Sequence, residues 1–125
     1  NVKILPPISR SELISMYQKS DILFLHLNDS PAFKKVLPSK IFEYAAMGKP
    51  IWAGVSGYAA DFLNAEVENV AVFEPGNHGQ ALQLLDSLDI TLTRREDFVN
   101  KYSRENIMTK MAKDLVDFAS SGVKL

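Results

Sequence analysis

The stretch "KKVLPSKIFEYAAMGKPIWAGVSG", residues 34–57, joins a short apolar helix pattern to an apolar strand pattern. Pro38 is a residue type favoured in the first turn of a helix, and Gly48 is a candidate for the C-terminal cap. We therefore expect a helix over 38–47 and a strand over 50–54. A helix that leads directly into an apolar strand is typical of α/β proteins.

The same alternation extends to both sides of this stretch. Ser9 and Glu12 have the spacing of a capping box and predict a helix start, and a further short helix is expected near 58–64. The further predicted strands cover residues 2–5, 21–27 and 70–73. The run "DILFLHL", residues 21–27, is continuously apolar, as in a strand of a parallel sheet that is covered on both faces. The sequence predicts an α/β fold, a Rossmann-like parallel sheet with flanking helices.

The C-terminal third of the chain is predicted to be helical, as a tail to this sheet. Helix starts are indicated at Asn77, at Thr93 and at Ser103, the first two with capping-box-like spacing. In the last helix an apolar stripe, expected to pack on the core, is formed by Ile107, Met111, Leu115 and Phe118. The charges of "TRREDF", residues 93–98, predict a solvated helix start.

Composition excludes several classes of function. The chain has 125 residues, 46% of them hydrophobic, which suffices for one domain spanning 1–125. The formal net charge of −1 gives no general attraction to nucleic acid or anionic lipid. There is no cysteine and no apolar run near the roughly 20 residues of a membrane span. Because the chain opens at Asn1 in strand-like sequence, we expect it to be part of a longer protein.

The start of the helix near Pro38 is a candidate anion site. Ligands of open parallel sheets bind beyond the carboxyl ends of the strands, where helix N-termini gather. The free N–H groups of Ser39 and Lys40, with the positive end of the helix dipole, suit a phosphate or diphosphate. Lys34, Lys35 and Lys40 add mobile positive charge.

Glu43 is the one acidic residue of this helix. Helical geometry places it one turn after Ser39 and Lys40, where a carboxylate can accept hydrogen bonds from a ribose or another vicinal diol. The alternative is a solvated ion pair with Lys40, worth roughly 0.2–0.5 kcal/mol. Spacing alone leaves both interpretations open.

The series "LPSKIFEYAAMGKPIWAG", with "VAVFEPGN" further along, resembles the donor-binding half of family 4 retaining glycosyltransferases of the GT-B fold. The segments "NVKILPPISRSELISMYQKSDILFLHL" and "NKYSRENIMTKMAKDL" are similar to the family's flanking regions, so the resemblance covers nearly the whole chain. Among such enzymes, those building bacterial capsule or O-antigen polysaccharide look most similar.

The resemblance implies roles for individual residues. Glu43 matches the second glutamate of the family's paired-glutamate motif, which holds the ribose of the nucleotide-sugar donor. Ser39 and Lys40 match the helix start that faces the donor phosphates. Gly57 lies in a loop near the site, and Ile8 lies in the segment that approaches the base. The first glutamate of the pair, which contacts the donor sugar, falls at Lys35, which is a departure from the motif.

The resemblance also implies that this chain is part of the C-terminal domain of an enzyme whose N-terminal acceptor domain and first donor-domain strands are missing here. The intact enzyme would transfer a sugar from a nucleoside diphosphate to a lipid-linked or oligosaccharide acceptor with retention, without a metal or other cofactor. It would be cytoplasmic, or peripheral at the inner face of the membrane. The chain alone is expected to be inactive. Residues 2–5 are expected either to pair beside 21–27 or to associate with another copy.

Two other functions are alternatives to this interpretation. A non-catalytic homologue that binds nucleotide-sugar is favoured by Lys35. A receiver-like signalling domain would need an aspartate at the end of the strand over 21–27, where the sequence has His26. For His26 itself, packing or a loop hydrogen bond is expected rather than a catalytic role.

Overall fold

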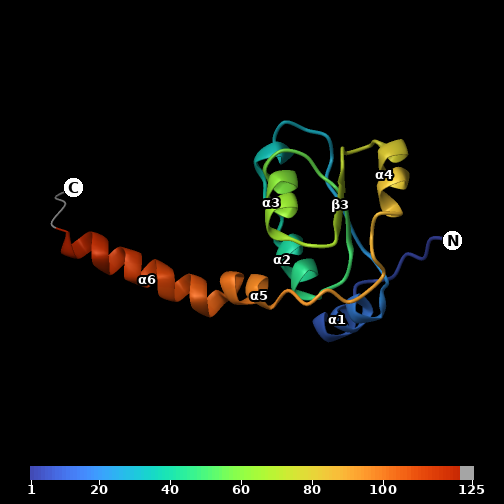
Figure 1. Ribbon diagram of the computed structural model, residues 1–125. Coiled ribbons are helices and arrows are strands. Elements are labelled where there is room, and N and C mark those ends of the chain that lie inside the picture. The colour runs from blue at the N-terminus through green and yellow to red at the C-terminus, as the bar shows by residue number, and fades with distance from the viewer. Residues whose placement is uncertain (122–125) are drawn as a thin grey trace. The chain divides into compact units, whose positions relative to one another are not determined.

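The computed structural model describes residues 1–121 (Figure 1). The chain divides into two compact units, residues 1–95 and 96–125. The strands are β1 (Leu23–His26), β2 (Ile51–Gly54) and β3 (Val70–Phe73). The helices of the first unit are α1 (Arg10–Lys19), the 3-10 helix η1 (Phe33–Lys35), α2 (Ser39–Ala46), α3 (Tyr58–Glu66) and α4 (His78–Leu85). The second unit contains α5 (Glu96–Tyr102) and α6 (Arg104–Ser120).

The sheet of the first unit is three-stranded and parallel, in the order β1-β2-β3. Phe24 pairs in register with Trp52, and Trp52 with Ala71. The helix α2 connects β1 to β2, and α3 connects β2 to β3. In Figure 1, α2 and α3 lie on one side of the sheet and α4 lies on the other. The predicted Rossmann-like α/β fold is confirmed.

The core lies between the sheet and the two crossover helices. Its fully buried members, at 0% exposure, are Ile41, Ala45, Ile51, Ala53, Ala59 and Leu63. Burying one isoleucine or leucine side chain stabilises a fold by about 1.5–3 kcal/mol. The small alanines at the contacts allow α2 and α3 to pack close to the strands.

Most local signals in the sequence are confirmed. The Ser9 side chain accepts a hydrogen bond from the Glu12 N–H, and the Glu12 carboxylate accepts one from the Ser9 N–H at 2.9 Å. Gly48 follows α2 with φ of +71°, as expected of a helix C-terminal glycine. Asn77 and Ser103 accept hydrogen bonds from N–H groups at the starts of α4 and α6.

The prediction of a strand over residues 2–5 is wrong. No strand is assigned there, and Val2 and Ile4 are 94% and 91% exposed. The first of the two expected arrangements, pairing beside residues 21–27, is therefore also wrong, because the sheet contains β1, β2 and β3 alone among the described residues. An apolar segment becomes a strand only where another strand completes its hydrogen bonds, and its sequence does not supply that partner.

The strand β1 is shorter than expected and is not covered on both faces. Its residues alternate between buried and exposed, and Phe24 is 51% exposed. The edge strand β1 thus has one face packed and the other partly open, while α4 packs on β2 and β3 on that second side of the sheet. The burial of a strand depends on which elements pack on each of its faces. A run of apolar residues does not predict which elements those are.

For residues 93–98, the prediction of a helix cap at Thr93 is wrong, and the prediction of a solvated helix start is wrong for one of its charges. Thr93 does not cap a helix: α5 begins at Glu96, and the Thr93 side chain accepts a hydrogen bond from the Asn69 side chain at 3.1 Å. Arg94, Glu96 and Asp97 are exposed, as expected of a solvated helix start, but Arg95 is buried, with 8% of its surface exposed. Its long side chain reaches carbonyl groups that lie far away in the sequence, so local charge patterning misses it.

The apolar stripe of α6 is present, but it is not buried. No residue of α6 is buried, and Met111 and Leu115 are 52% and 67% exposed. For the residues that the structure describes, the expectation that the stripe packs on the core stays a prediction. Among those residues, the structure has no helix with the length and hydrophobicity that a membrane crossing requires.

Candidate functional site

The helix α2 begins at the carboxyl end of the sheet with backbone donors available. After β1 ends at His26, the chain passes through η1 and reaches Pro38, which has extended backbone angles (φ −65°, ψ 136°) and gives no side-chain cap. The Ile41 N–H donates to the Pro38 carbonyl at 3.1 Å, so regular helical bonding begins there. The N–H groups of Ser39 and Lys40 precede that first bond and have no partner within the helix. The backbone donors expected of these two residues are therefore present, and the binding of an anion to them stays a prediction.

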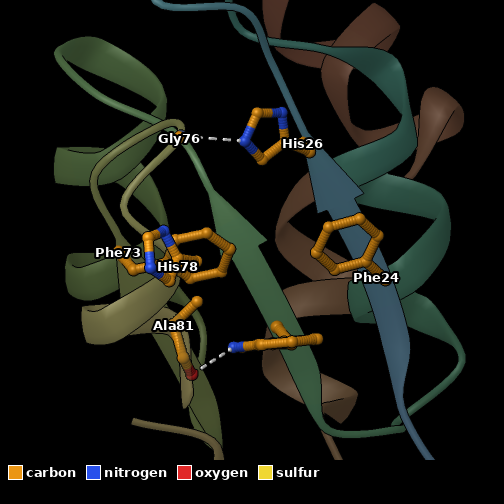
Figure 2. Close-up of a pocket in the computed structure, with 7 residues that line it drawn as sticks. Phe24, His26, Phe73, Gly76, His78 and Ala81 are labelled. Carbon is orange, nitrogen blue, oxygen red and sulfur yellow. Dashed lines mark hydrogen bonds between the residues drawn. The ribbon is translucent and has the colours of Figure 1, made fainter. Parts of the chain in front are cut away.

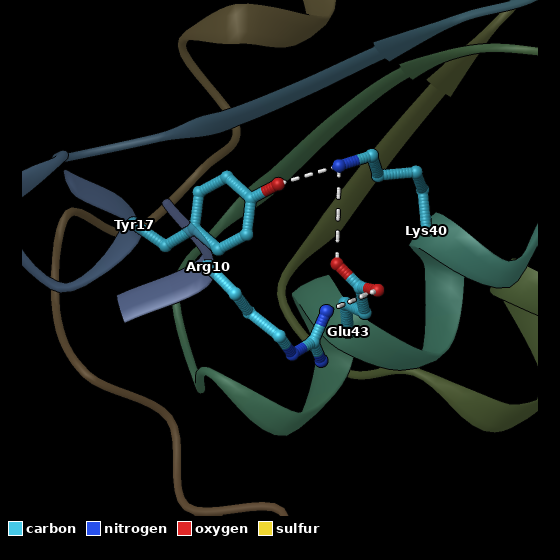
Figure 3. Close-up of polar contacts among 4 residues, drawn as sticks. All are labelled: Arg10, Tyr17, Lys40 and Glu43. Atoms are coloured by element: carbon cyan, nitrogen blue, oxygen red, sulfur yellow. Dashed lines mark hydrogen bonds and ion pairs between the residues drawn. The ribbon is translucent and has the colours of Figure 1, made fainter. Parts of the chain in front are cut away.

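Glu43 lies one turn further along α2, between two cations (Figure 3). Its Oε1 is 3.5 Å from Arg10 Nη1, and its Oε2 is 3.8 Å from Lys40 Nζ. The Glu43 side chain is 31% exposed, and that of Arg10 is 72% exposed. The expected pair with Lys40 is real, but the Arg10 contact joins residues 33 positions apart and has no signal in the sequence.

Lys40 is held in place and does not behave as a mobile charge. Its ammonium group donates to the Tyr17 hydroxyl at 2.6 Å and lies 5.3 Å from the centre of the Tyr17 ring. The hydrogen bond to Tyr17 raises the pKa of Lys40 above 10.5, and partial burial opposes that rise. Tyr17 and Tyr44 pack edge to face at 5.2 Å, and burial raises the pKa of Tyr44. These contacts fasten α1 to α2.

Gly57 lies against the loop that leads to α2. It precedes α3 with φ of +63° and ψ of −137°, and a Cβ atom there would lie 2.9 Å from the Lys34 Cα. Residues with side chains rarely adopt this backbone conformation, so the close approach requires glycine. The structure thus brings together Gly57 and the segment that carries Lys34 and Lys35.

Two predicted site residues make no direct contact with the others. Lys35 lies in η1 with an exposed side chain, which has no hydrogen bond or ion pair within residues 1–121. Ile8 is 37% exposed and lies two residues before Arg10, whose side chain contacts Glu43. The Arg10 contact places the start of α1, and with it the segment containing Ile8, on the Glu43 side of α2.

A hollow lies on the α4 side of the sheet, and no pattern in the sequence predicts it (Figure 2). This cavity of about 200 Å³ is lined by Phe24, His26, Trp52, Phe73, Gly76, His78 and Ala81. The His26 Nε2 accepts a hydrogen bond from the Gly76 N–H at 3.1 Å, so the expected loop hydrogen bond of His26 is observed. The alternation of Phe24 and His26 in β1 is the signal that places both side chains on one face.

Comparison with protein-family models, with curated proteins and with solved structures finds no match to this chain. The arrangement itself defines the chemistry that the site offers. It combines two free helix N–H groups with a partly exposed carboxylate one turn away. Such a combination suits a ligand that carries a phosphate group and, about one helical turn from it, a pair of hydroxyl groups.

Proposed function

We propose that this chain is the nucleotide-sugar donor-binding region of a retaining glycosyltransferase of the GT-B type. The observation that carries the proposal is the partly exposed carboxylate of Glu43, one turn from the uncapped start of α2. The position of that start, at the carboxyl end of a parallel strand, is where open α/β sheets bind ligands. The residue series of 34–57 supplies the link to a family.

In this proposal the donor diphosphate binds at the start of α2. The N–H groups of Ser39 and Lys40 donate to phosphate oxygens, and the helix dipole favours the negative charge. That charge grows as the bond to the sugar breaks, so donors that are already oriented stabilise the transition state. Lys34 and Lys35 lie on the approach to the same helix and add positive charge.

Glu43 then accepts hydrogen bonds from the hydroxyl groups of the donor ribose. The sugar passes to a hydroxyl group of a lipid-linked or oligosaccharide acceptor with retention of configuration, in the synthesis of surface polysaccharide. The acceptor is bound by a separate N-terminal domain.

A non-catalytic nucleotide-sugar-binding protein is the second candidate function. Its support is Lys35, which stands where the family resemblance expects a glutamate to contact the donor sugar. Its exposed ammonium group offers donors but no acceptor for sugar hydroxyls. This variant of the function keeps the nucleotide site and lacks transfer.

The substitution Glu43→Gln in the full-length protein tests the proposal. A hydrogen bond to a charged acceptor is worth about 1.5–3 kcal/mol, and the partial exposure of Glu43 favours the lower end of that range. We expect UDP or GDP, whichever the wild-type protein binds, to bind about tenfold more weakly to the variant. Isothermal titration calorimetry measures the change, and circular dichroism checks that folding is intact.

A matched control is Glu105→Gln, which alters an exposed glutamate in the first turn of α6. It should leave nucleotide binding unchanged. Equal donor KM and kcat in wild type and Glu43→Gln would reduce Glu43 to a member of a surface ion pair. Binding without turnover in the wild-type protein would favour the non-catalytic alternative.

A further inference from the structure

The cavity of about 200 Å³ on the α4 side of the sheet has aromatic walls (Figure 2). The ring planes of Phe24 and Phe73 are nearly parallel, 16° apart, with their centroids separated by 6.5 Å. The Trp52 ring lies 5.1 Å from the Phe24 ring and 5.5 Å from the Phe73 ring, tilted against both. Because β1, β2 and β3 each contribute one of these rings, the hydrogen-bonded sheet fixes their relative positions. The three rings therefore form a preorganised aromatic surface.

Two pairs of polar groups in the cavity wall are bonded to each other. The Trp52 indole N–H donates to the Ala81 carbonyl at 3.0 Å, and the Gly76 N–H donates to His26 Nε2 at 3.1 Å. These groups need no hydrogen bond from a ligand. A polar group of a ligand that lay against the rings would lose its hydrogen bonds to water without a replacement, which is unfavourable. The inner part of the cavity consequently favours an apolar ligand.

The volume and the opening of the cavity suit one small ring system. An apolar cavity of about 150 Å³ is large enough to bind benzene. A volume of about 200 Å³ therefore accommodates a ring together with a substituent. One side of the cavity is open, since Phe24 is 51% exposed and the side chains of His26 and His78 are exposed. A polar substituent on the ring can remain in water on that side.

We propose that this cavity binds a small planar aromatic molecule with one polar substituent, whose ring contacts Phe24, Trp52 and Phe73. Aromatic rings gain offset and edge contacts with one another beyond the apolar area that they bury. A saturated ring of the same size fills the same volume without those contacts, so it should bind about three- to tenfold more weakly. The cavity is separate from the proposed donor site, because α2 and α4 lie on opposite sides of the sheet (Figure 1).

The experiment titrates phenol and indole into the full-length protein, with cyclohexanol as the non-aromatic match to phenol. The NMR signal of the Trp52 indole N–H, assigned from its loss in Trp52→Phe, reports binding at the cavity. We expect phenol to shift this signal with a dissociation constant of about 1 mM or tighter, a normal affinity for so small a ligand. Phenol should bind about three- to tenfold more tightly than cyclohexanol.

Two variants change the cavity from different walls. Ala81→Met places a larger side chain at a buried α4 residue that lines the cavity, and it should abolish measurable phenol binding. Its matched control is Leu82→Met at the next residue of α4, which is 62% exposed and should bind phenol as wild type does. Phe24→Ala removes a half-exposed ring, so it tests the cavity even if Ala81→Met fails to fold. It should lower the preference for phenol over cyclohexanol to below about twofold.

Three results would overturn the proposal. Wild type might leave the Trp52 signal unchanged with phenol and indole, as it would if another segment or a second copy fills the cavity. Cyclohexanol might bind as tightly as phenol, which would show that the rings do not select the ligand. Phe24→Ala might keep the wild-type preference, which would place the bound ligand elsewhere. The binding of UDP or GDP, measured on the same samples, tests the donor site separately and should be unchanged in Leu82→Met and Phe24→Ala.

Discussion

Replacing Arg95 with methionine removes a charged group that ties three separate segments of the first unit together. Its Nη1 donates to the Ala45 and Lys49 carbonyls, each at 3.1 Å, and its Nη2 donates to Lys49 at 3.1 Å and to Glu68 at 2.6 Å. These carbonyls lie in the last turn of α2 and just before β2 and β3. A cation at the end of α2 also complements the negative end of the helix dipole.

The expected loss in the free energy of unfolding is about 3–5 kcal/mol. A buried carbonyl group that loses its donor costs about 1–3 kcal/mol, and three carbonyl groups lose their donor at once. The sum of the individual hydrogen bonds of Arg95 would exceed about 3–5 kcal/mol, but the cost of burying its charge offsets part of that sum. The same burial lowers the pKa of Arg95, and the nearby Glu68 opposes that shift. Domains are stable by about 5–15 kcal/mol, so the change is a large fraction of the total.

Urea denaturation followed by circular dichroism measures this loss as a shift in the transition midpoint at constant slope. The matched control is Arg10→Met, the same chemical change at a side chain that is 72% exposed, and it should cost less than about 1 kcal/mol. Arg95→Lys should fall between the two, because a lysine has fewer donors and cannot reach all three carbonyls. If Arg95→Met costs no more than Arg10→Met, the buried hydrogen bonds do not stabilise the fold and the reasoning fails.

Two further predictions concern the backbone of the site and the start of α1. Gly57→Ala should destabilise the first unit by about 1–3 kcal/mol and displace the Lys34 segment. The control is Gly79→Ala in α4, which should not destabilise the unit, because a Cβ atom there meets nothing closer than 3.7 Å. Equal melting temperatures for the two variants would contradict this prediction. Hydrogen bonds from Ser9 hold the pKa of the Glu12 carboxyl below its usual value of 4.5. The stability that ionised Glu12 supplies is therefore present above pH 4.5, and it is lost as the pH falls through the lowered pKa of the folded protein. Glu12→Gln should therefore lower the melting temperature at pH 7, with the difference from wild type vanishing in strong acid; a difference that persists there would show that ionisation is not involved.

The start of the candidate site could be read from the chain, because its determinants lie close together in sequence. Pro38, Glu43 and Gly48 define a helix start, a side chain one turn along and a helix end through local geometry alone. The capping box of Ser9 and Glu12 is equally local, and it is observed. Interactions within one helical turn depend on spacing, so spacing predicts them.

Contacts between distant segments were decided by the tertiary structure. Arg10 reaches Glu43, and Arg95 reaches the end of α2, across separations at which a charged residue has many possible partners. The open face at Phe24 has the same cause, since burial depends on what packs against a strand. The sequence by itself determined the α/β pattern and the place of the helix start. Packing alone decided which charges surround Glu43 and which are buried, because those outcomes depend on the whole chain folding around each group.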